Sequence, residues 1–163
     1  MKRHLLAPLL CLAVLLTGCK PSEEVVWQTT LDNTGTQVRL SNCTVQTADV
    51  NYRFLSGQTY TEQQVLCLYA QESAPVLWID APKSQIEVTF ADAAGDGFAL
   101  YEKALPVEQV DMIPTELPDG TTEYRFDTIY NFAITVTDGE KTDRLLLSCS
   151  RDGYNEKNPA AAG

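Results

Sequence analysis

Apolar and polar residues alternate along most of this chain from residue 25 onward. A period of two indicates half-buried β-strands, because successive side chains of a strand point to opposite faces. Ile86, Val88 and Phe90 give the clearest example, since polar or small residues separate them. The pattern predicts strands over the following segments: Val25–Leu31, Gln37–Val45, Val50–Leu55, Gln63–Ala70, Val76–Ile79, Ile86–Ala91, Phe98–Leu105, Glu123–Thr128, Tyr130–Thr137 and Arg144–Ser150.

The segment Gln63–Ala70 allows two interpretations. Thr61 and Gln64 have the spacing of a capping box, which would begin a helix. Val65, Cys67 and Tyr69 alternate with other residues as they would in a strand. We favour the strand.

Short strands separated by turn signals are typical of an all-β domain. The turn signals include Asp32–Gly35, Pro118–Gly120 and Asp138–Gly139. We therefore expect an antiparallel β-sandwich over residues 25–152, with residues 153–163 as a disordered tail. Its core should include the alternating apolar residues of the last two strands, namely Phe132, Ile134, Val136, Leu145 and Leu147. Trp78, inside an apolar run, is expected in the core as well, whereas Trp27 could lie in the core or at the surface.

Residues 130–139, Tyr-Asn-Phe-Ala-Ile-Thr-Val-Thr-Asp-Gly, resemble the penultimate strand and final hairpin of immunoglobulin-like and fibronectin-like domains. The resemblance implies an immunoglobulin-like sandwich. The chain departs from true immunoglobulin domains at Phe132, which stands where the second bridging cysteine would be. The alternative architecture is a small closed β-barrel of the kind seen in periplasmic lysozyme inhibitors.

The first 18 residues have a different pattern. A basic head, Met1–His4, precedes the apolar run Leu5–Leu16, as in a secretory signal peptide. The run is shorter than the roughly 20 apolar residues that span a bilayer. Leu16-Thr17-Gly18-Cys19 resembles the lipobox of bacterial lipoproteins. The resemblance implies that residues 1–18 are removed, that Cys19 carries a diacylglyceryl group on its sulfur, and that residues 19–24 form a short tether.

The expected location is therefore the cell envelope, outside the cytoplasm. The lipid would lie in the outer leaflet of the cytoplasmic membrane, or in the outer membrane if the envelope has one. The full chain has 12 Lys and Arg against 22 Asp and Glu, so loss of Lys2 and Arg3 leaves a formal net charge of −12. Such a chain repels nucleic acid and anionic headgroups, and attachment to the membrane must come from the lipid.

Histidine is absent from the expected mature chain, because the only histidine is His4. That absence excludes Ser-His-Asp and Cys-His mechanisms, and no G-x-S-x-G or H-E-x-x-H motif is present. A carboxylate pair acting on a glycosidic bond is the chemistry that remains. We favour a binding or envelope-assembly module that holds an envelope protein or a surface ligand. A small carboxylate-based extracytoplasmic hydrolase is the alternative.

Asp92 and Asp96 flank a Gly-containing turn and are the candidates for a calcium site. Gly95 and Ala94 occupy positions that would carry ligands in an EF-hand, so we interpret the segment as a hairpin loop and expect no cofactor besides the lipid. Cys43, Cys67 and Cys149 remain after Cys19 is acylated. Their number is odd, so at most one disulfide could close within the chain, and buried free thiols are the commoner outcome.

The longest irregular stretch, Pro106–Gly120, contains three prolines. Loops of about 12–15 residues in compact domains are often functional. Val110, Met112 and Ile113 lie among acidic residues there and are the candidates for a protein contact. The alternative is that Val110, Met112 and Ile113 form another edge strand and pack inward, since Val110 and Met112 alternate.

Overall fold

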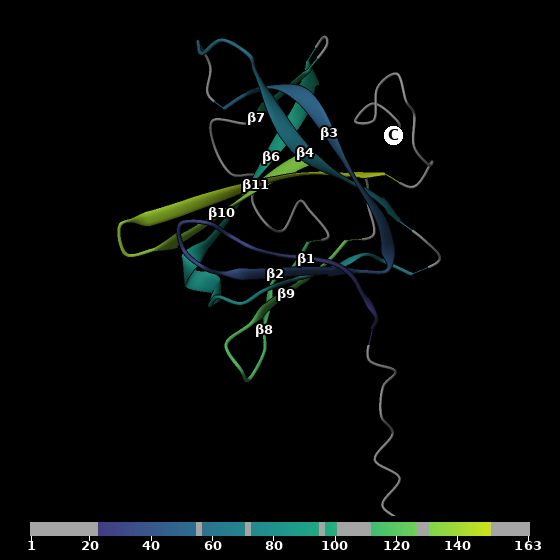
Figure 1. Ribbon diagram of the computed structural model, residues 1–163, viewed down its shortest axis with the longest axis vertical. Helices are drawn as coiled ribbons and strands as arrows, with labels where there is room; N and C mark the ends of the chain where they lie inside the picture. Colours follow the sequence, from purple (N-terminus) through teal and green to yellow (C-terminus); the bar gives the residue numbers. More distant parts are fainter. Residues whose placement is uncertain are drawn as a thin grey trace, which may run out of the picture.

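The computed structural model describes residues 23–54, 57–70, 73–94, 97–100, 112–126 and 131–150, and of residues 92–94 and 97–100 it describes the backbone alone. Within these ranges the chain is almost wholly strand, with one turn of 3-10 helix, η1 (Lys83–Gln85) (Figure 1). The strands are β1 (Val25–Thr30), β2 (Gln37–Ser41), β3 (Cys43–Arg53), β4 (Thr61–Ala70), β5 (Val76–Ile79), β6 (Ile86–Ala94), β7 (Gly97–Leu100), β8 (Thr115–Glu116), β9 (Thr122–Arg125), β10 (Asn131–Asp138) and β11 (Lys141–Ser150). The described part of the chain contains no helix with the length and hydrophobicity to cross a membrane.

Two sheets form the domain, as expected for a β-sandwich. The first sheet has the strand order β1-β2-β5-β9-β8, and the second has the order β10-β11-β4-β3-β7-β6. Most neighbours are antiparallel, while β11 pairs with β4 and β3 pairs with β7 in parallel. The predicted antiparallel β-sandwich is confirmed.

Hydrogen bonding closes the second sheet upon itself. The last residues of β6 pair with β7, and its first residues pair with β10. Because β10 and β6 stand at the two ends of the strand order, their pairing closes the sheet. The first sheet remains a separate, open layer across the other side of the core (Figure 1). The domain as a whole is therefore a two-layer structure and not the single closed barrel of the alternative.

The chain changes sheets at Asn42, which corrects one predicted strand. The segment Gln37–Val45 was expected to be continuous, but it divides into β2 and β3 at Asn42, whose φ is 58°. Asparagine tolerates this left-handed conformation better than most residues. The Asn42 Nδ2 donates to the carbonyl of Ala74 at 3.3 Å, which stabilises the bend. β3 then continues to Arg53 and includes most of the separately predicted segment Val50–Leu55.

The other predicted strands lie close to their expected positions. Gln63–Ala70 is a strand, within β4, and not a helix. β9 ends at Arg125, short of the predicted Thr128. The predicted strand from Phe98 is β7 as far as Leu100, and its remainder lies outside the described residues. Gly120 adopts a φ of 87° and donates its N–H to the Leu117 carbonyl at 3.0 Å, as the predicted turn requires.

The main core lies between the two sheets. Of the residues expected there, Phe132, Ile134, Val136 and Leu147 are at most 1% exposed, and Leu145 is half-buried against them. The ring of Phe132 lies between two other rings, with its centroid 6.2 Å from that of Phe90 and 5.5 Å from that of Phe126. Residues from both sheets therefore meet at Phe132.

A smaller apolar cluster lies against the opposite face of the second sheet. It consists of Tyr52, Val65, Ala91, Ala133 and Leu146. The alternate residues of β4 belong to different clusters, since Leu66 and Leu68 face the main core and Val65 faces the smaller one. Burial on both faces explains why the apolar run of β4 is nearly continuous.

All three described cysteines, Cys43, Cys67 and Cys149, are buried free thiols. Burial raises the pKa of Cys43 to about 11 and also raises that of Cys67, because the low-polarity surroundings disfavour the thiolate. Both groups therefore remain protonated near neutral pH and behave as small apolar side chains.

One carboxylate, that of Asp143 at the start of β11, connects the two sheets. Its Oδ2 accepts from the backbone N–H and the Oγ1 of Thr34 at 2.7 and 2.8 Å. Its Oδ1 accepts from the side-chain amide of Asn33 at 2.9 Å. Desolvation opposes ionisation, but these donors outweigh it and lower the pKa of Asp143 below its ordinary value. Asp143 thus holds the β1–β2 turn of the first sheet against the β10–β11 hairpin of the second.

Replacing Asp143 with alanine should lower the free energy of unfolding by about 1–2 kcal/mol, because several charge-assisted hydrogen bonds are lost at a partly exposed site. Since the folded-state pKa is depressed, this stabilisation exists above the unfolded pKa of about 4 and disappears as the pH falls through the folded pKa. Urea denaturation at pH 7 and at about pH 3 should therefore show a difference between wild type and Asp143→Ala that shrinks in acid. Asp138→Ala, an exposed change on the same hairpin, is the control. An equal effect of both substitutions would contradict the assigned role.

Candidate functional site

The outer face of the first sheet, the one turned away from the core, carries Trp78. This residue was expected in the core, and that prediction is wrong: Leu77 and Ile79 are fully buried, whereas Trp78 is half-buried on the opposite side of β5. Trp27, by contrast, packs against the core. An uninterrupted apolar run does not indicate which alternate residues face inward, so the sequence offered no basis for the distinction.

Strand register places one residue from each strand in a row across this outer face. Gln28 of β1 lies opposite Arg39 of β2, and Arg39 lies opposite Trp78 of β5. Trp78 in turn lies opposite Glu123 of β9, and Glu123 lies opposite Thr115 of β8. Directly opposed residues in neighbouring strands are within contact distance of one another. We refer to Gln28, Arg39, Trp78, Glu123 and Thr115 as the cross-strand row.

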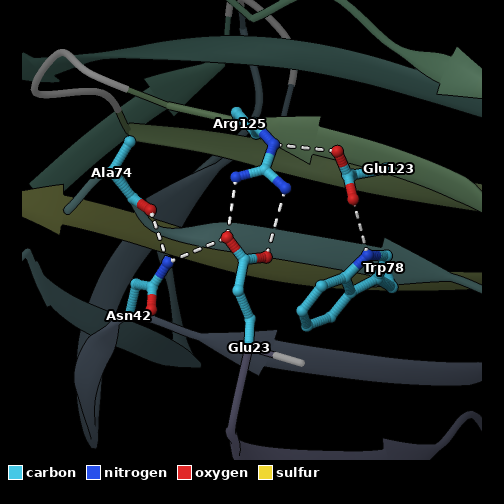
Figure 2. A network of polar contacts seen from close by, with 6 residues as sticks. All are labelled: Glu23, Asn42, Ala74, Trp78, Glu123 and Arg125. Carbon is cyan, nitrogen blue, oxygen red and sulfur yellow. Dashed lines mark hydrogen bonds and ion pairs between the residues drawn. The ribbon is translucent and has the colours of Figure 1, made fainter. Parts of the chain in front are cut away.

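A network of ionic and polar contacts holds the indole of Trp78 in place (Figure 2). The Trp78 Nε1 donates to Glu123 Oε2 at 2.9 Å, and Arg125 Nε donates to Glu123 Oε1 at 2.8 Å. Glu123 is well shielded from solvent, with its side chain 17% exposed. Both of its oxygens are thus engaged, and the edge of the indole is fixed on the sheet.

Arg125 also binds Glu23, which precedes β1. The terminal nitrogens of Arg125 contact both carboxylate oxygens of Glu23, at 2.9 and 3.1 Å, and Figure 2 shows the paired geometry. Asn42 Nδ2 donates to Glu23 as well, at 3.4 Å. The hydrogen bonds to Glu23 and then those to Glu123 raise the pKa of Arg125, so its charge is permanent. This bidentate pair fixes the beginning of the described chain to β9.

A pocket of about 260 Å³ opens on the outer face beside the row. It is lined by residues of β1 and β2, namely Gln28, Thr29, Thr30, Gln37 and Arg39. Gln28 lies opposite Arg39 and Thr30 opposite Gln37, so the pocket lies over two successive pairs of facing residues. Every lining side chain can form hydrogen bonds, and Arg39 carries the one formal charge among them.

Arg39 lines the pocket and also contacts Trp78, the central residue of the cross-strand row. Its guanidinium carbon lies over the Trp78 ring, 5.8 Å from the centroid, in a cation–π arrangement. Among the residues that the structure describes, the buried Arg39 Nε has no hydrogen-bond partner. The charge of Arg39 contributes to the lowered pKa of Asp119, behind the larger effect of hydrogen bonds from Thr121. Arg39 is therefore a positioned cation with unused donor capacity.

The residues predicted from the sequence lie elsewhere. Met112 is 3% exposed and belongs to the main core, as the alternative predicted, but residues 112–114 form no strand and Ile113 is 69% exposed, contrary to that alternative. A partner could reach Ile113 but not Met112. Cys19, Val110 and Asp96 lie outside the described residues. Of Asp92 only the backbone is described; it belongs to β6 and pairs with Ala99. No group of three His, Cys, Asp or Glu side chains that could hold a metal ion occurs in the described ranges.

The sequence did not predict that these residues of the outer face lie side by side. Gln28 and Arg39 are ordinary polar positions of two alternating strands, and Trp78 is about forty residues further along the chain. Their association depends on the pairing of β2 with β5, which a local pattern does not specify. Comparison of the chain with protein-family models, with curated proteins and with solved structures finds no match.

Proposed function

We propose that this chain is a lipid-anchored, extracytoplasmic β-domain of a bacterial cell envelope that acts as a binding or assembly module. The lipid on Cys19 attaches it to the membrane, and a sandwich of immunoglobulin-like character presents the outer face of the first sheet to a ligand or partner. The observation that carries the binding role is the polar pocket beside Arg39 and Trp78. Fixed, partly exposed aromatic and arginine side chains are the groups most enriched at recognition sites.

The position of Glu23 supports an anchored domain held close to its membrane. Glu23 follows Cys19 by four residues, and four residues of extended chain span at most about 14 Å. Because Glu23 is ion-paired to Arg125 of the first sheet, little free tether remains between the lipid and the domain. The acidic charge of the domain opposes contact with anionic headgroups, so the fixed tether sets the distance and the lipid supplies the attachment.

Among the contacts of the described residues, none favours the hydrolase alternative. Glu23 and Glu123 are the carboxylates nearest to Trp78 in the network, and both are engaged by Arg125. Their oxygens are occupied by hydrogen bonds from Arg125, Trp78 and Asn42, so neither carboxylate is free to reach a glycosidic bond. We therefore assign these carboxylates a structural role, in positioning Trp78 and the tether.

In-cell photo-cross-linking tests the proposed function. A benzophenone amino acid at Gln28, in the pocket, should yield adducts of increased mass in the membrane fraction. The same amino acid at Glu140, an exposed position in the β10–β11 turn, serves as the control and should yield few or none. Equal or absent adducts at both positions would count against a binding role for the outer face, and glycosidase activity of the purified domain would favour the alternative.

A further inference from the structure

We propose that the pocket on the outer face binds a saccharide that carries a carboxylate, and that Arg39 binds this carboxylate. The inference rests on the proposed binding function and adds the chemical class of the ligand. It depends on three observations: the composition of the pocket lining, the state of the Arg39 guanidinium, and the position of Trp78 beside it.

The lining suits a ligand rich in hydroxyl groups. The side-chain amides of Gln28 and Gln37 and the hydroxyls of Thr29 and Thr30 can each donate and accept hydrogen bonds. A sugar hydroxyl also does both, whereas an apolar ligand would leave these groups without partners. The volume of about 260 Å³ lies just below the range of roughly 300–1,000 Å³ for drug-sized ligands, so one or two sugar units fit it better than a protein segment.

The charge of the lining selects for a carboxylate. Arg39 is the one charged residue in it, and its Nε is buried without a hydrogen-bond partner in the described part of the chain. Because the Nε is buried, a ligand would meet the two terminal nitrogens of the guanidinium, which have no hydrogen-bond partner among the described residues and can form two parallel hydrogen bonds with one carboxylate. Glu123 already accepts bonds from Trp78 and Arg125, so a carboxylate from outside would be the acidic partner of the Arg39 terminal nitrogens.

The acidic character of the whole domain limits the choice of ligand further. At a formal net charge of −12, a densely sulfated or phosphorylated polymer would be repelled. A short uronate has one carboxylate for the one cation in the pocket and little other charge, whereas a long polyuronate would be repelled as well. We therefore expect a uronate-type unit.

Trp78 supplies the readout, because a carboxylate on Arg39 would change the charge beside its ring. The experiment titrates the purified domain, residues 20–163, with glucuronate, galacturonate and their di- and trisaccharides, following tryptophan emission. Isothermal titration calorimetry measures the same affinities independently of fluorescence. Glucose, galactose and their oligomers are the neutral probes. Saturable binding of the acidic sugars, at least about tenfold tighter than of the neutral ones, is the expected result.

Two arginine variants form a matched pair. Arg39→Gln should weaken uronate binding by at least about tenfold. Arg53→Gln should leave it unchanged, although Arg53 also lies over an aromatic ring, 5.2 Å from the Tyr60 centroid, and also has a buried Nε without a partner in the described residues. Both variants remove one positive charge, so a general charge effect would appear in each. If Arg39→Gln does not fold, as judged by circular dichroism, Arg39→Lys keeps the charge, loses the two-point geometry and should still weaken binding.

The inference is overturned if neutral and acidic sugars bind equally, if no probe binds, or if uronate binding survives at Arg39→Gln. Cross-linking from Gln28 separates this failure from failure of the proposed function. Adducts at Gln28 without saccharide binding would leave the binding role standing with a different ligand. If neither adducts at Gln28 nor saccharide binding is observed, the proposed function and the proposed ligand are both contradicted.

Discussion

Substitution of Phe132 by alanine should lower the free energy of unfolding by about 3–5 kcal/mol. The side chain is fully buried, and its ring contacts Phe90 of the second sheet and Phe126, which follows β9 of the first. Removing the ring would take away contacts with both layers and leave a cavity that neither sheet can fill without shifting. Domains of this size have a total stability of about 5–15 kcal/mol, so the loss would be a large part of it.

Equilibrium denaturation of the purified domain measures this effect. Ile113→Ala is the matched control, since it also removes a large apolar side chain, but one that is 69% exposed. Its free energy of unfolding should change by no more than about 0.5 kcal/mol. Similar losses for the two variants would contradict the packing of Phe132 between the sheets.

The strands and much of the core could be predicted from the sequence, because alternation is a local property. Phe132, Ile134 and Val136 are spaced two apart between small or polar neighbours, and each is buried. The β10–β11 hairpin follows from the same logic, with a tight Asp-Gly turn between two alternating strands. In such segments the alternate apolar residues all lie on one face of the strand, so the pattern predicts which face is buried.

The arrangement of the strands could not be predicted in the same way. Asn42 separates two strands of different sheets, and the apolar positions shift there by one residue, from Leu40 to Cys43, but a shift of this kind does not indicate that the chain changes sheets. The parallel pairing of β11 with β4 joins segments about eighty residues apart, and nothing local to either specifies the partner. Long-range pairing of this kind is decided by the packing of the whole core.

The candidate site depends almost wholly on these long-range pairings. The bidentate contact of Glu23 with Arg125 spans a sequence separation of 102 residues, and Trp78 bonds Glu123 across 45. Polar residues on the solvent face of a strand carry no signal that separates a site from an ordinary surface. For that reason the sequence analysis predicted a contact site in a loop, at Met112 and Ile113. The pairing of β2, β5 and β9 instead places Arg39, Trp78 and Glu123 side by side on the face of a sheet.

Cys19→Ala should abolish attachment of the lipid to the protein. The proposed lipid would hold the domain at the membrane, since proposed removal of residues 1–18 leaves a formal net charge of −12, which opposes contact with anionic headgroups. Each buried methylene contributes about 0.8 kcal/mol, so two or more acyl chains anchor stably where a single chain binds only marginally. Loss of the sulfur that receives the first chains should therefore leave an uncleaved or soluble protein.

Metabolic labelling with a fatty-acid analogue, followed by fractionation, measures the effect. Wild type should carry the label and sediment with membranes, and Cys19→Ala should lose the label and keep the size of the precursor. Cys67→Ala is the matched control, because it also removes a thiol, but one that is buried and 1% exposed in the described domain, out of reach of an acylating enzyme. It should be labelled as strongly as wild type. Equal labelling of Cys19→Ala would show that the lipid is attached elsewhere, and the short tether between Cys19 and Glu23 would then have no part in holding the domain at the membrane.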